Sequence, residues 1–188
     1  MVKRFYKYFR CIIVIIIVIT THSFSQIKIE GFSAGIGAGT IKGNFPAIFS
    51  YSFNMGIDTR LFSVDDPFFR FNFIFLKDFN SILPEERLNR YYPFLQGISL
   101  TAVKTIHFYK NAYLEESAGL LMLNDRTFSD VNLMSYGVVF SLALKLPLFD
   151  ILTEKRGFFL GVETVYGLTL TNNTPQYFTV QLIGRYQL

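Results

Sequence analysis

The feature that most constrains the fold is a strict two-residue alternation of apolar and polar side chains over long stretches. Residues 48–62 read IFSYSFNMGIDTRLF, which places aromatic and aliphatic side chains on one parity and small or polar ones on the other. This period predicts a β-strand, because successive side chains of a strand point to opposite faces. The same pattern recurs over 68–79, 133–146, 158–171 and 177–188. We therefore expect an all-β chain.

Three further segments are predicted strands with weaker alternation. Residues 29–41 place Gly31, Ser33, Gly35, Gly37 and Gly39 on one parity, and interior glycines weaken a strand but permit tight curvature. Residues 94–109 and 112–123 alternate less strictly, because Lys104 and Glu116 fall on the otherwise apolar parity. Either these two stretches lie near a membrane edge or a bulge shifts their register. The chain then has eight strands.

The length of the strands favours a membrane barrel over a soluble β-sandwich or a lipocalin-like barrel. Strands of soluble proteins usually run about 5–6 residues, whereas a tilted strand needs about 9–11 residues to cross the hydrocarbon of a bilayer. The clean segments here run from 12 to 15 residues. An eight-stranded barrel has an interior that side chains just fill, so the small polar parity is expected inside and the bulky parity outside. The predicted fold is an eight-stranded antiparallel up-and-down transmembrane β-barrel.

The N-terminus has the pattern of an export signal. The first ten residues carry four basic side chains and no acid, and the apolar run CIIVIIIVIT that follows is too short to span a bilayer as a helix. Small residues at Ser23 and Ser25 complete a secretory signal peptide. We expect 1–25 to be a cleaved signal peptide and 26–188 to be a single outer-membrane β-barrel domain.

Removal of the predicted signal changes the charge of the chain. The full sequence has 18 Lys and Arg against 14 Asp and Glu, and four of the bases lie in the signal, so the mature chain has a formal net charge of zero. This balance gives no support for nucleic-acid binding, which needs a basic patch on the folded domain. The only cysteine, Cys11, also lies in the signal. The mature chain therefore has neither a disulfide framework nor a thiol nucleophile.

The connections between strands suggest an orientation. If the first strand starts on the inner side of the membrane, the long connection 80–93 lies outside and the two-residue link 110–111 lies inside, as transmembrane barrels prefer. The inner connection 147–157 is longer than that rule expects. The remaining predicted connections are 42–47, 124–132 and 172–176 on the outer side and 63–67 on the inner side.

The outer connection 80–93 also holds the best candidate for a loop contact with a partner. Four of its residues combine charge with aromatic area on an exposed loop: Arg87, Arg90, Tyr91 and Tyr92. The alternative is an aromatic girdle at the membrane interface together with solvated charges.

Polar side chains of the strands are predicted to gather in the periplasmic half of the lumen. The parity and direction of their strands predict that six of these side chains face inward at this end: Asp58, Arg60, Arg70, Lys145, Glu163 and Arg185. His107, and Glu115 if its strand keeps register, are expected at the same end. The opposite half is expected to be lined mainly by Gly, Ser, Thr and Asn. Because an unpaired buried ion costs several kcal/mol, the charges should be paired.

Two interpretations of this polar cluster stay open. Glu163 and Arg185 are the preferred pair, since they are predicted on adjacent strands at similar depth. In the first interpretation the cluster is a structural plug of ion pairs. In the second it belongs to a gated polar path or a ligand site. An eight-stranded wall leaves no ready-made channel, which favours the plug.

In its signal peptide, eight amphipathic strands and alternating last strand, the chain resembles the small eight-stranded outer-membrane β-barrel proteins of Gram-negative bacteria. The resemblance covers 27–188. It implies location in the outer membrane and contact with outer-membrane lipid and lipopolysaccharide. It also implies insertion by the barrel-assembly machinery and a potential role as a subunit beside other outer-membrane proteins. In that family the last strand serves as the assembly signal and often ends on an aromatic; Phe178 and Tyr186 fit, and the final Leu188 departs from the pattern.

Some members of this family are lipid A deacylases, with a His and a Ser near the last strands. The matching stretch here, YGLTLTNNTPQYF, contains neither residue, and His107 is the only histidine outside the predicted signal. A nucleophile without a base in reach is not activated. We therefore predict a non-enzymatic barrel with a structural, surface-binding or complex-subunit role, and no cofactor or metal. The alternatives are a lipid-acting hydrolase and a narrow gated pore.

Overall fold

The computed structural model of the chain describes eight stretches separated by short gaps. They are 28–43, 46–60, 67–82, 92–109, 112–127, 133–148, 157–171 and 174–188. The predicted signal peptide, 1–25, lies outside the described residues.

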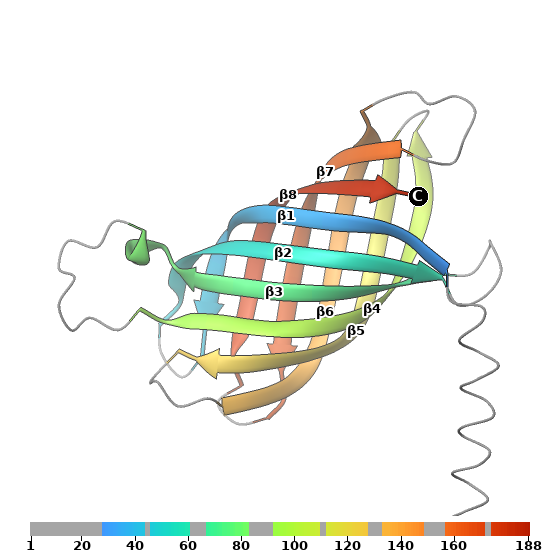
Figure 1. The fold of residues 1–188 in the computed structure, drawn as a ribbon. Coiled ribbons are helices and arrows are strands. Elements are labelled where there is room, and N and C mark those ends of the chain that lie inside the picture. The colour runs from blue at the N-terminus through green and yellow to red at the C-terminus, as the bar shows by residue number, and fades with distance from the viewer. Residues whose placement is uncertain are drawn as a thin grey trace, which may run out of the picture.

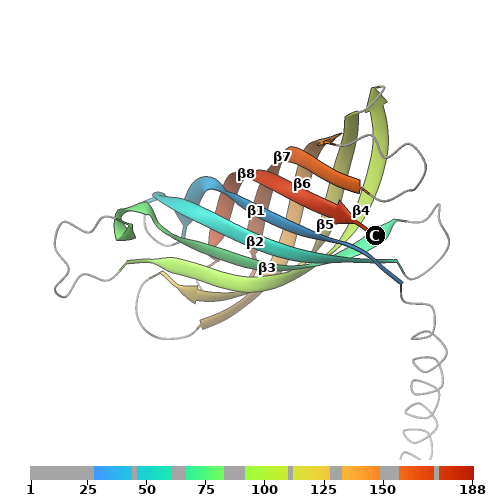
Figure 2. The same cartoon turned by 45° about the horizontal axis from the view of Figure 1, so that its top comes forward.

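The described residues form a closed barrel of eight antiparallel strands (Figure 1). Each strand pairs with the next in sequence, and the last pairs with the first, so that β1 lies between β8 and β2 (Figure 2). The strands are β1 Lys28–Lys42, β2 Ile48–Arg60, β3 Phe68–Asp78, β4 Phe94–Tyr109, β5 Ala112–Arg126, β6 Leu133–Pro147, β7 Gly157–Thr169 and β8 Gln176–Gln187. A short 3₁₀ helix, η1 Phe79–Ser81, follows β3. The predicted up-and-down barrel is confirmed.

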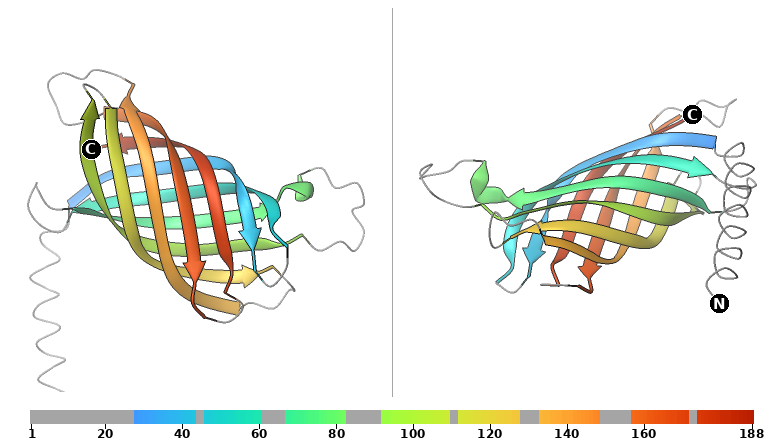
Figure 3. Two further views of the ribbon diagram at one scale, coloured as in Figure 1. Left: turned by 180° about the vertical axis from the view of Figure 1, so that it is seen from behind. Right: turned by 60° about the horizontal axis from the view of Figure 1, so that its bottom comes forward.

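The strands are strongly staggered around the barrel. A row of paired residues that starts at Lys104 on β4 passes once through the other seven strands and returns to β4 at Phe94, ten residues away. Such a stagger requires the strands to tilt against the barrel axis. Seen from behind, β6 and β7 cross the blue and green strands of the opposite wall at a steep angle (Figure 3). Residues that meet in the lumen from opposite walls therefore belong to different rows of paired residues.

Two names are useful for the ends of the barrel. The base is the end where β1 begins at Lys28 and β8 ends at Gln187, and the rim is the opposite end, which carries η1 and the connection 79–93. The connections after β2, β4 and β6 lie at the base, and those after β1, β3, β5 and β7 lie at the rim. Within the described stretches, no helix is long and apolar enough to cross a bilayer.

The alternation of each strand separates an apolar outer face from a buried lumen. On β3, for example, Phe71 and Phe73 are more than 40% exposed. Arg70, which is next to Phe71 in sequence and points to the opposite face, is only 3% exposed. The outward position of the bulky parity is therefore confirmed. Lys104 and Glu116 also point outward and are exposed. The irregularity of β4 lies further on, between His107 and Tyr109, so a bulge does not account for the two charges.

The rim half of the lumen is filled by an apolar layer that the sequence did not predict. We call this set the rim layer: Ile41, Ile74, Leu76, Leu95, Leu121, Leu123, Val139, Val165 and Tyr177. Polar side chains such as Ser50 and Thr179 are buried beside it. The expectation that Gly, Ser, Thr and Asn mainly line this half is thus met only in part, because small side chains alone would leave the lumen underfilled.

Tyr177 shows how glycine and a large side chain share the narrow lumen. Tyr177 on β8 pairs with Gly167 on β7, and its side chain is almost fully buried. A Cβ atom at position 167 would lie within 2.1 Å of the tyrosine ring. The absence of a side chain at Gly167 therefore makes room for the ring, and the pair fills the space that two medium residues would otherwise occupy.

Candidate functional site

Five charged side chains meet in the lumen near the base. We call Asp58, Arg70, Glu115, Lys145 and Arg185 the base cluster; each is at most 5% exposed. They come from β2, β3, β5, β6 and β8, so the cluster joins walls that are far apart around the barrel. Alternation explains why each side chain points inward, and the stagger explains why they arrive at one depth.

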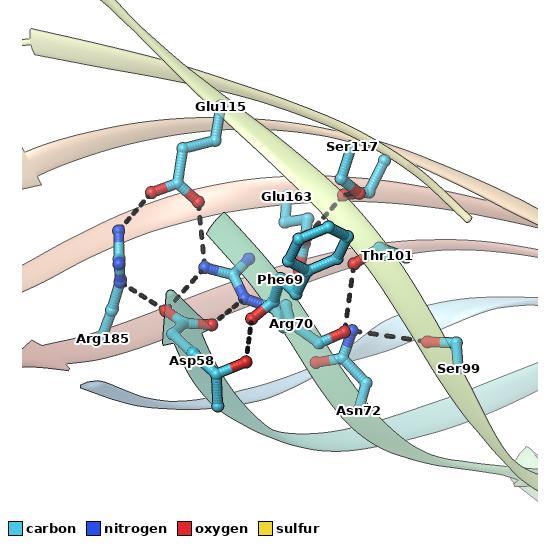
Figure 4. A network of polar contacts seen from close by, with 12 residues as sticks. Asp58, Phe69, Arg70, Asn72, Ser99, Thr101, Glu115, Ser117, Glu163 and Arg185 are labelled. Atoms are coloured by element: carbon cyan, nitrogen blue, oxygen red, sulfur yellow. Dashed lines mark hydrogen bonds and ion pairs between the residues drawn. The ribbon is translucent and has the colours of Figure 1, made fainter. Parts of the chain in front are cut away.

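Two carboxylates and two guanidinium groups form a closed ring (Figure 4). Arg70 Nε lies 2.6 Å from Asp58 Oδ1, and its Nη2 lies 3.1 Å from Glu115 Oε2. Arg185 Nε lies 2.7 Å from Asp58 Oδ2, and its Nη1 donates to Glu115 Oε1 at 2.7 Å. Each acid therefore bridges both arginines. A planar guanidinium suits this double bridging because it offers several donors in one rigid fork.

Two further side chains complete the cluster. Lys145 Nζ donates to Glu115 Oε2 at 2.6 Å, so Glu115 contacts three cations. The buried ring of Phe68 lies 4.4 Å from the guanidinium carbon of Arg185 and 5.4 Å from that of Arg70. A ring face attracts cations, and here it also covers both guanidinium groups. Glu115 is the centre of the arrangement.

The charges in the base half of the lumen balance once Glu163 is included. The base cluster has three cations and two anions, and Glu163, 5% exposed on β7, supplies a third anion nearby. Glu163 Oε1 accepts a hydrogen bond from Ser141 at 2.8 Å, and Ser141 also contacts Ser117 at 2.7 Å. Balance of this kind lowers the cost of holding ions away from water.

The predicted pairing of Glu163 with Arg185 is wrong. In the β7–β8 register Glu163 lies opposite Gln181, whereas Arg185 lies opposite Phe159, four residues nearer the base. Arg185 instead pairs with Asp58 and Glu115, and no ion pair joins it to Glu163 among the described residues. The error arose because depth was judged from strand directions, without the stagger that sets the register.

Two residues expected near this cluster occupy other positions. Arg60, at the base end of β2, is half-buried and pairs with Glu30, its Nε 2.7 Å from Glu30 Oε1. Glu30 was not predicted, since it falls on the outward parity and is itself the extra residue of the bulge between Ile29 and Gly31. His107 is exposed, and its ring packs edge-on against Tyr113. Glu115 keeps the inward register that the prediction required of it.

A small polar cavity separates the base cluster from the rim layer. Its volume is about 20 Å³, and its lining includes Asn54, Asn72, Ser99, Glu163 and Gln181. A cavity needs about 10–15 Å³ to hold one water molecule, so this space suits about one. Ionic, polar and apolar layers thus follow one another from base to rim.

The stretch that would carry catalysis in a deacylase-type barrel is occupied by structural hydrogen bonds. Thr169 Oγ1 donates to the carbonyl of Pro175 at 2.9 Å, and Thr171 Oγ1 accepts from the backbone amide of Tyr136 at 2.8 Å. Residues 172–173 lie outside the described residues. In the part of the chain that is described, no group of three His, Cys, Asp or Glu side chains could hold a metal ion.

The predicted loop contact is described only in part. Arg87, Arg90 and Tyr91 lie outside the described residues, and Tyr92 is half-buried just before β4. The described strands, however, place three cations on the outward parity at the rim: Lys42 on β1, Lys77 on β3 and Arg126 on β5. Arg126 lies 5.3 Å from the Phe94 ring. The acids Asp78 and Asp125 at this end are buried.

No protein-family model matches the chain, and no curated protein matches it. Solved structures do resemble it. Neisserial surface protein A (NspA) aligns with a TM-score of 0.61 at 13% identity, over 84% of this chain and 96% of that one. Ail, the attachment invasion locus protein of Yersinia pestis, in complex with the heparin analogue sucrose octasulfate, aligns with a TM-score of 0.52 at 12% identity, over 85% and 98%. At such identities the likeness shows a shared fold.

Proposed function

We propose that this eight-stranded barrel of the outer-membrane type is embedded in the outer membrane of a Gram-negative bacterium and acts through the surfaces it presents. The observation that carries the proposal is the filled lumen: a buried ionic cluster, a cavity for about one water and an apolar layer follow one another along the axis. Among the described residues this filling leaves no open path along the axis, which supports a role as a rigid anchor over a role as a pore or an enzyme. The apolar outer face and the likeness to NspA and Ail support insertion in this membrane.

In the proposed orientation the base faces the periplasm and the rim faces outward. The long connection 79–93 at the rim supports this choice, because outer-membrane barrels carry short periplasmic turns and longer outer loops. Insertion by the barrel-assembly machinery, with β8 as its signal, belongs to the same proposal. In this orientation Arg87, Arg90, Tyr91 and Tyr92 would lie on the cell surface and remain our candidate contact for a partner.

The rim cations suggest lipopolysaccharide as the lipid partner. Lys42, Lys77 and Arg126 lie on three strands at the rim, and the described acids of that end are buried. Phosphate groups of lipopolysaccharide in the outer leaflet would face these cations, and charge-assisted contacts to phosphate are strong. Ail provides a parallel, because a protein of this fold was crystallised with a polyanion, sucrose octasulfate.

Conductance in planar bilayers tests the closed lumen. Folded protein is expected to leave a bilayer electrically silent, because the base cluster and the rim layer obstruct the axis. Discrete conductance steps would contradict the proposal in favour of a gated pore. In a parallel assay, folded protein incubated with lipopolysaccharide should leave its acyl chains intact by mass spectrometry. Released acyl chains would instead favour a lipid-acting hydrolase.

Binding of lipopolysaccharide tests the rim. The double variant Lys42→Gln, Lys77→Gln should bind lipopolysaccharide vesicles more weakly, by about 1 kcal/mol for each lost charge near an anionic surface. Lys28→Gln is the control, because this lysine is exposed at the base end of β1. Equal loss of binding in the control and the double variant would contradict a site at the rim.

A further inference from the structure

The outward face of the barrel carries one pair of opposite charges in its base half, where β4 and β5 extend past the base end of β3. Among the described residues of the strands, Lys104 on β4 and Glu116 on β5 are exposed on this face and directly opposite each other in the register. Apolar surface continues toward the base beside them. Glu116 pairs with Leu142 on β6, and Leu144 and Leu146 beyond it are 47% and 54% exposed. Along the strands, the pair therefore lies between apolar side chains.

Charges on the lipid-facing surface of a barrel are destabilising, increasingly so toward the middle of the bilayer. Lys104 and Glu116 can attract each other, but their remaining donor and acceptor positions still face an apolar medium. A protein surface with complementary charges would satisfy these positions. The pair thus marks a place where a partner is favoured over lipid.

The two rows of paired residues next to the charged pair, toward the rim, combine small and large exposed apolar side chains. Ala102 and Ala118 are opposite each other and exposed, and they are followed by Leu100 and Leu120, which are 48% and 68% exposed. On the adjoining strands, Phe69 pairs with Ala102 and Phe140 pairs with Ala118. Small residues between larger ones allow close approach of two backbones, which is what drives association within a membrane.

We infer that this β4–β5 face binds a second copy of the chain, as a two-fold symmetric dimer in the plane of the membrane. The argument for a second copy is charge complementarity. A two-fold axis along the membrane normal, passing between β4 and β5, places Lys104 of each copy opposite Glu116 of the other. In such an isologous contact residue i meets j and j meets i, so one surface supplies both halves of two ion pairs. Ala102 and Ala118 meet across the same axis. The inference depends on membrane insertion as proposed above.

Charge reversal in lipid vesicles is the first test. The full chain is folded into phospholipid vesicles, and dimer is measured by chemical crosslinking at a series of protein-to-lipid ratios. Lys104→Glu or Glu116→Lys alone should reduce dimer affinity about tenfold, because each places like charges against each other twice. The double variant Lys104→Glu, Glu116→Lys should restore the dimer, since both ion pairs reform with exchanged ends. A monomeric unmodified protein, or single reversals without effect, would overturn the inference.

Cysteine crosslinking locates the interface. Ala118→Cys should form a disulfide-linked dimer on oxidation, because position 118 lies beside the proposed axis. Ala34→Cys on β1 is the matched control, with the same substitution at an exposed outward alanine on another part of the wall. Cys11 is replaced by Ser in both variants, so that no other thiol is present. Equal crosslinking at both positions would overturn the inference. Crosslinking of position 118 only to a chain of different mass in native membranes would do so as well.

Heat-modifiable gel mobility in the same vesicles separates failure of this inference from failure of the proposed function. Folded, inserted barrels that stay monomeric would refute only the dimer. Protein that does not insert into the vesicles would refute the proposed function itself.

Discussion

The base half and the rim half of the lumen are filled by opposite chemistries. At the base, Asp58, Arg70, Glu115, Lys145 and Arg185 form a buried ring of ion pairs joined by short contacts. At the rim, nine apolar or aromatic side chains pack together with neighbouring serines and threonines. Both halves belong to the same eight strands and occupy the same narrow interior.

The comparison shows two ways in which a narrow lumen can be filled. An apolar layer stabilises by removing apolar surface from water and tolerates substitutions of similar volume. A buried ion cluster gains little over apolar packing when it is complete, but it is costly to break, because the remaining charge has no partner. The base cluster is therefore sensitive to the loss of any one member, while the rim layer mainly supplies packing.

The sharpest test of this difference removes the central acid. Glu115→Gln leaves Arg70 and Arg185 with Asp58 as their remaining acid and removes the carboxylate that pairs with Lys145, so we expect a loss of about 3–5 kcal/mol in the free energy of unfolding. Urea titration in lipid vesicles, followed by circular dichroism, measures it. Glu116→Gln, on the next residue but on the outward face, is the matched control; at a protein-to-lipid ratio low enough to keep the chain monomeric, it should change the free energy much less. Similar losses in the two variants would refute the conclusion that the base cluster is costly to break.

A truncation in the rim layer should cost less than this. Leu123→Ala removes a fully buried side chain and leaves a cavity, for which we expect a loss of about 2–4 kcal/mol in the same titration. Leu120→Ala, on the same strand but 68% exposed, is its control. If Leu123→Met were as harmful as the alanine variant, the rim layer would depend on specific shape instead of on volume.

Gly167 offers a more local test of the rim layer. Gly167→Ala should displace the Tyr177 ring and lower the free energy of unfolding by about 1–3 kcal/mol, as overpacking does. Gly157→Ala on the same strand is the control, because the nearest atom to its new Cβ would be Phe159 Cε2 at 3.8 Å. Unchanged stability of Gly167→Ala would show that the ring can move without cost.

The smallest expected effect distinguishes the observed ion pairs from the one predicted from sequence. In double-mutant cycles, Glu115→Gln with Arg185→Gln should show coupling of about 0.5–3 kcal/mol, because the two groups are in contact. Glu163→Gln with Arg185→Gln should be additive to within about 0.5 kcal/mol, since Glu163 instead accepts from Ser141. Strong coupling in the second cycle would restore the predicted pair.

What the sequence determined by itself is the set of properties that depend on local pattern. Alternation predicted the eight strands, and the bounds of β6, predicted at 133–146 and observed at Leu133–Pro147, show how closely. It also predicted which parity faces outward and which faces inward, and the buried side chains of Asp58, Arg70, Lys145 and Arg185 agree with it. Parity is a property of a single strand, so neighbouring residues are enough to reveal it.

Only the tertiary structure decided which inward side chains meet. The partner of Arg185 depends on the ten-residue stagger that accumulates around the closed barrel, and no single strand carries that information. The rim layer was missed for a related reason. A strand contributes at most two members, such as Ile74 and Leu76 on β3, and these form a layer only when closure brings them to the same depth as the others. Closure of the barrel requires the registers of all eight strand pairs to be mutually consistent, and these registers together determine which side chains are in contact within the lumen.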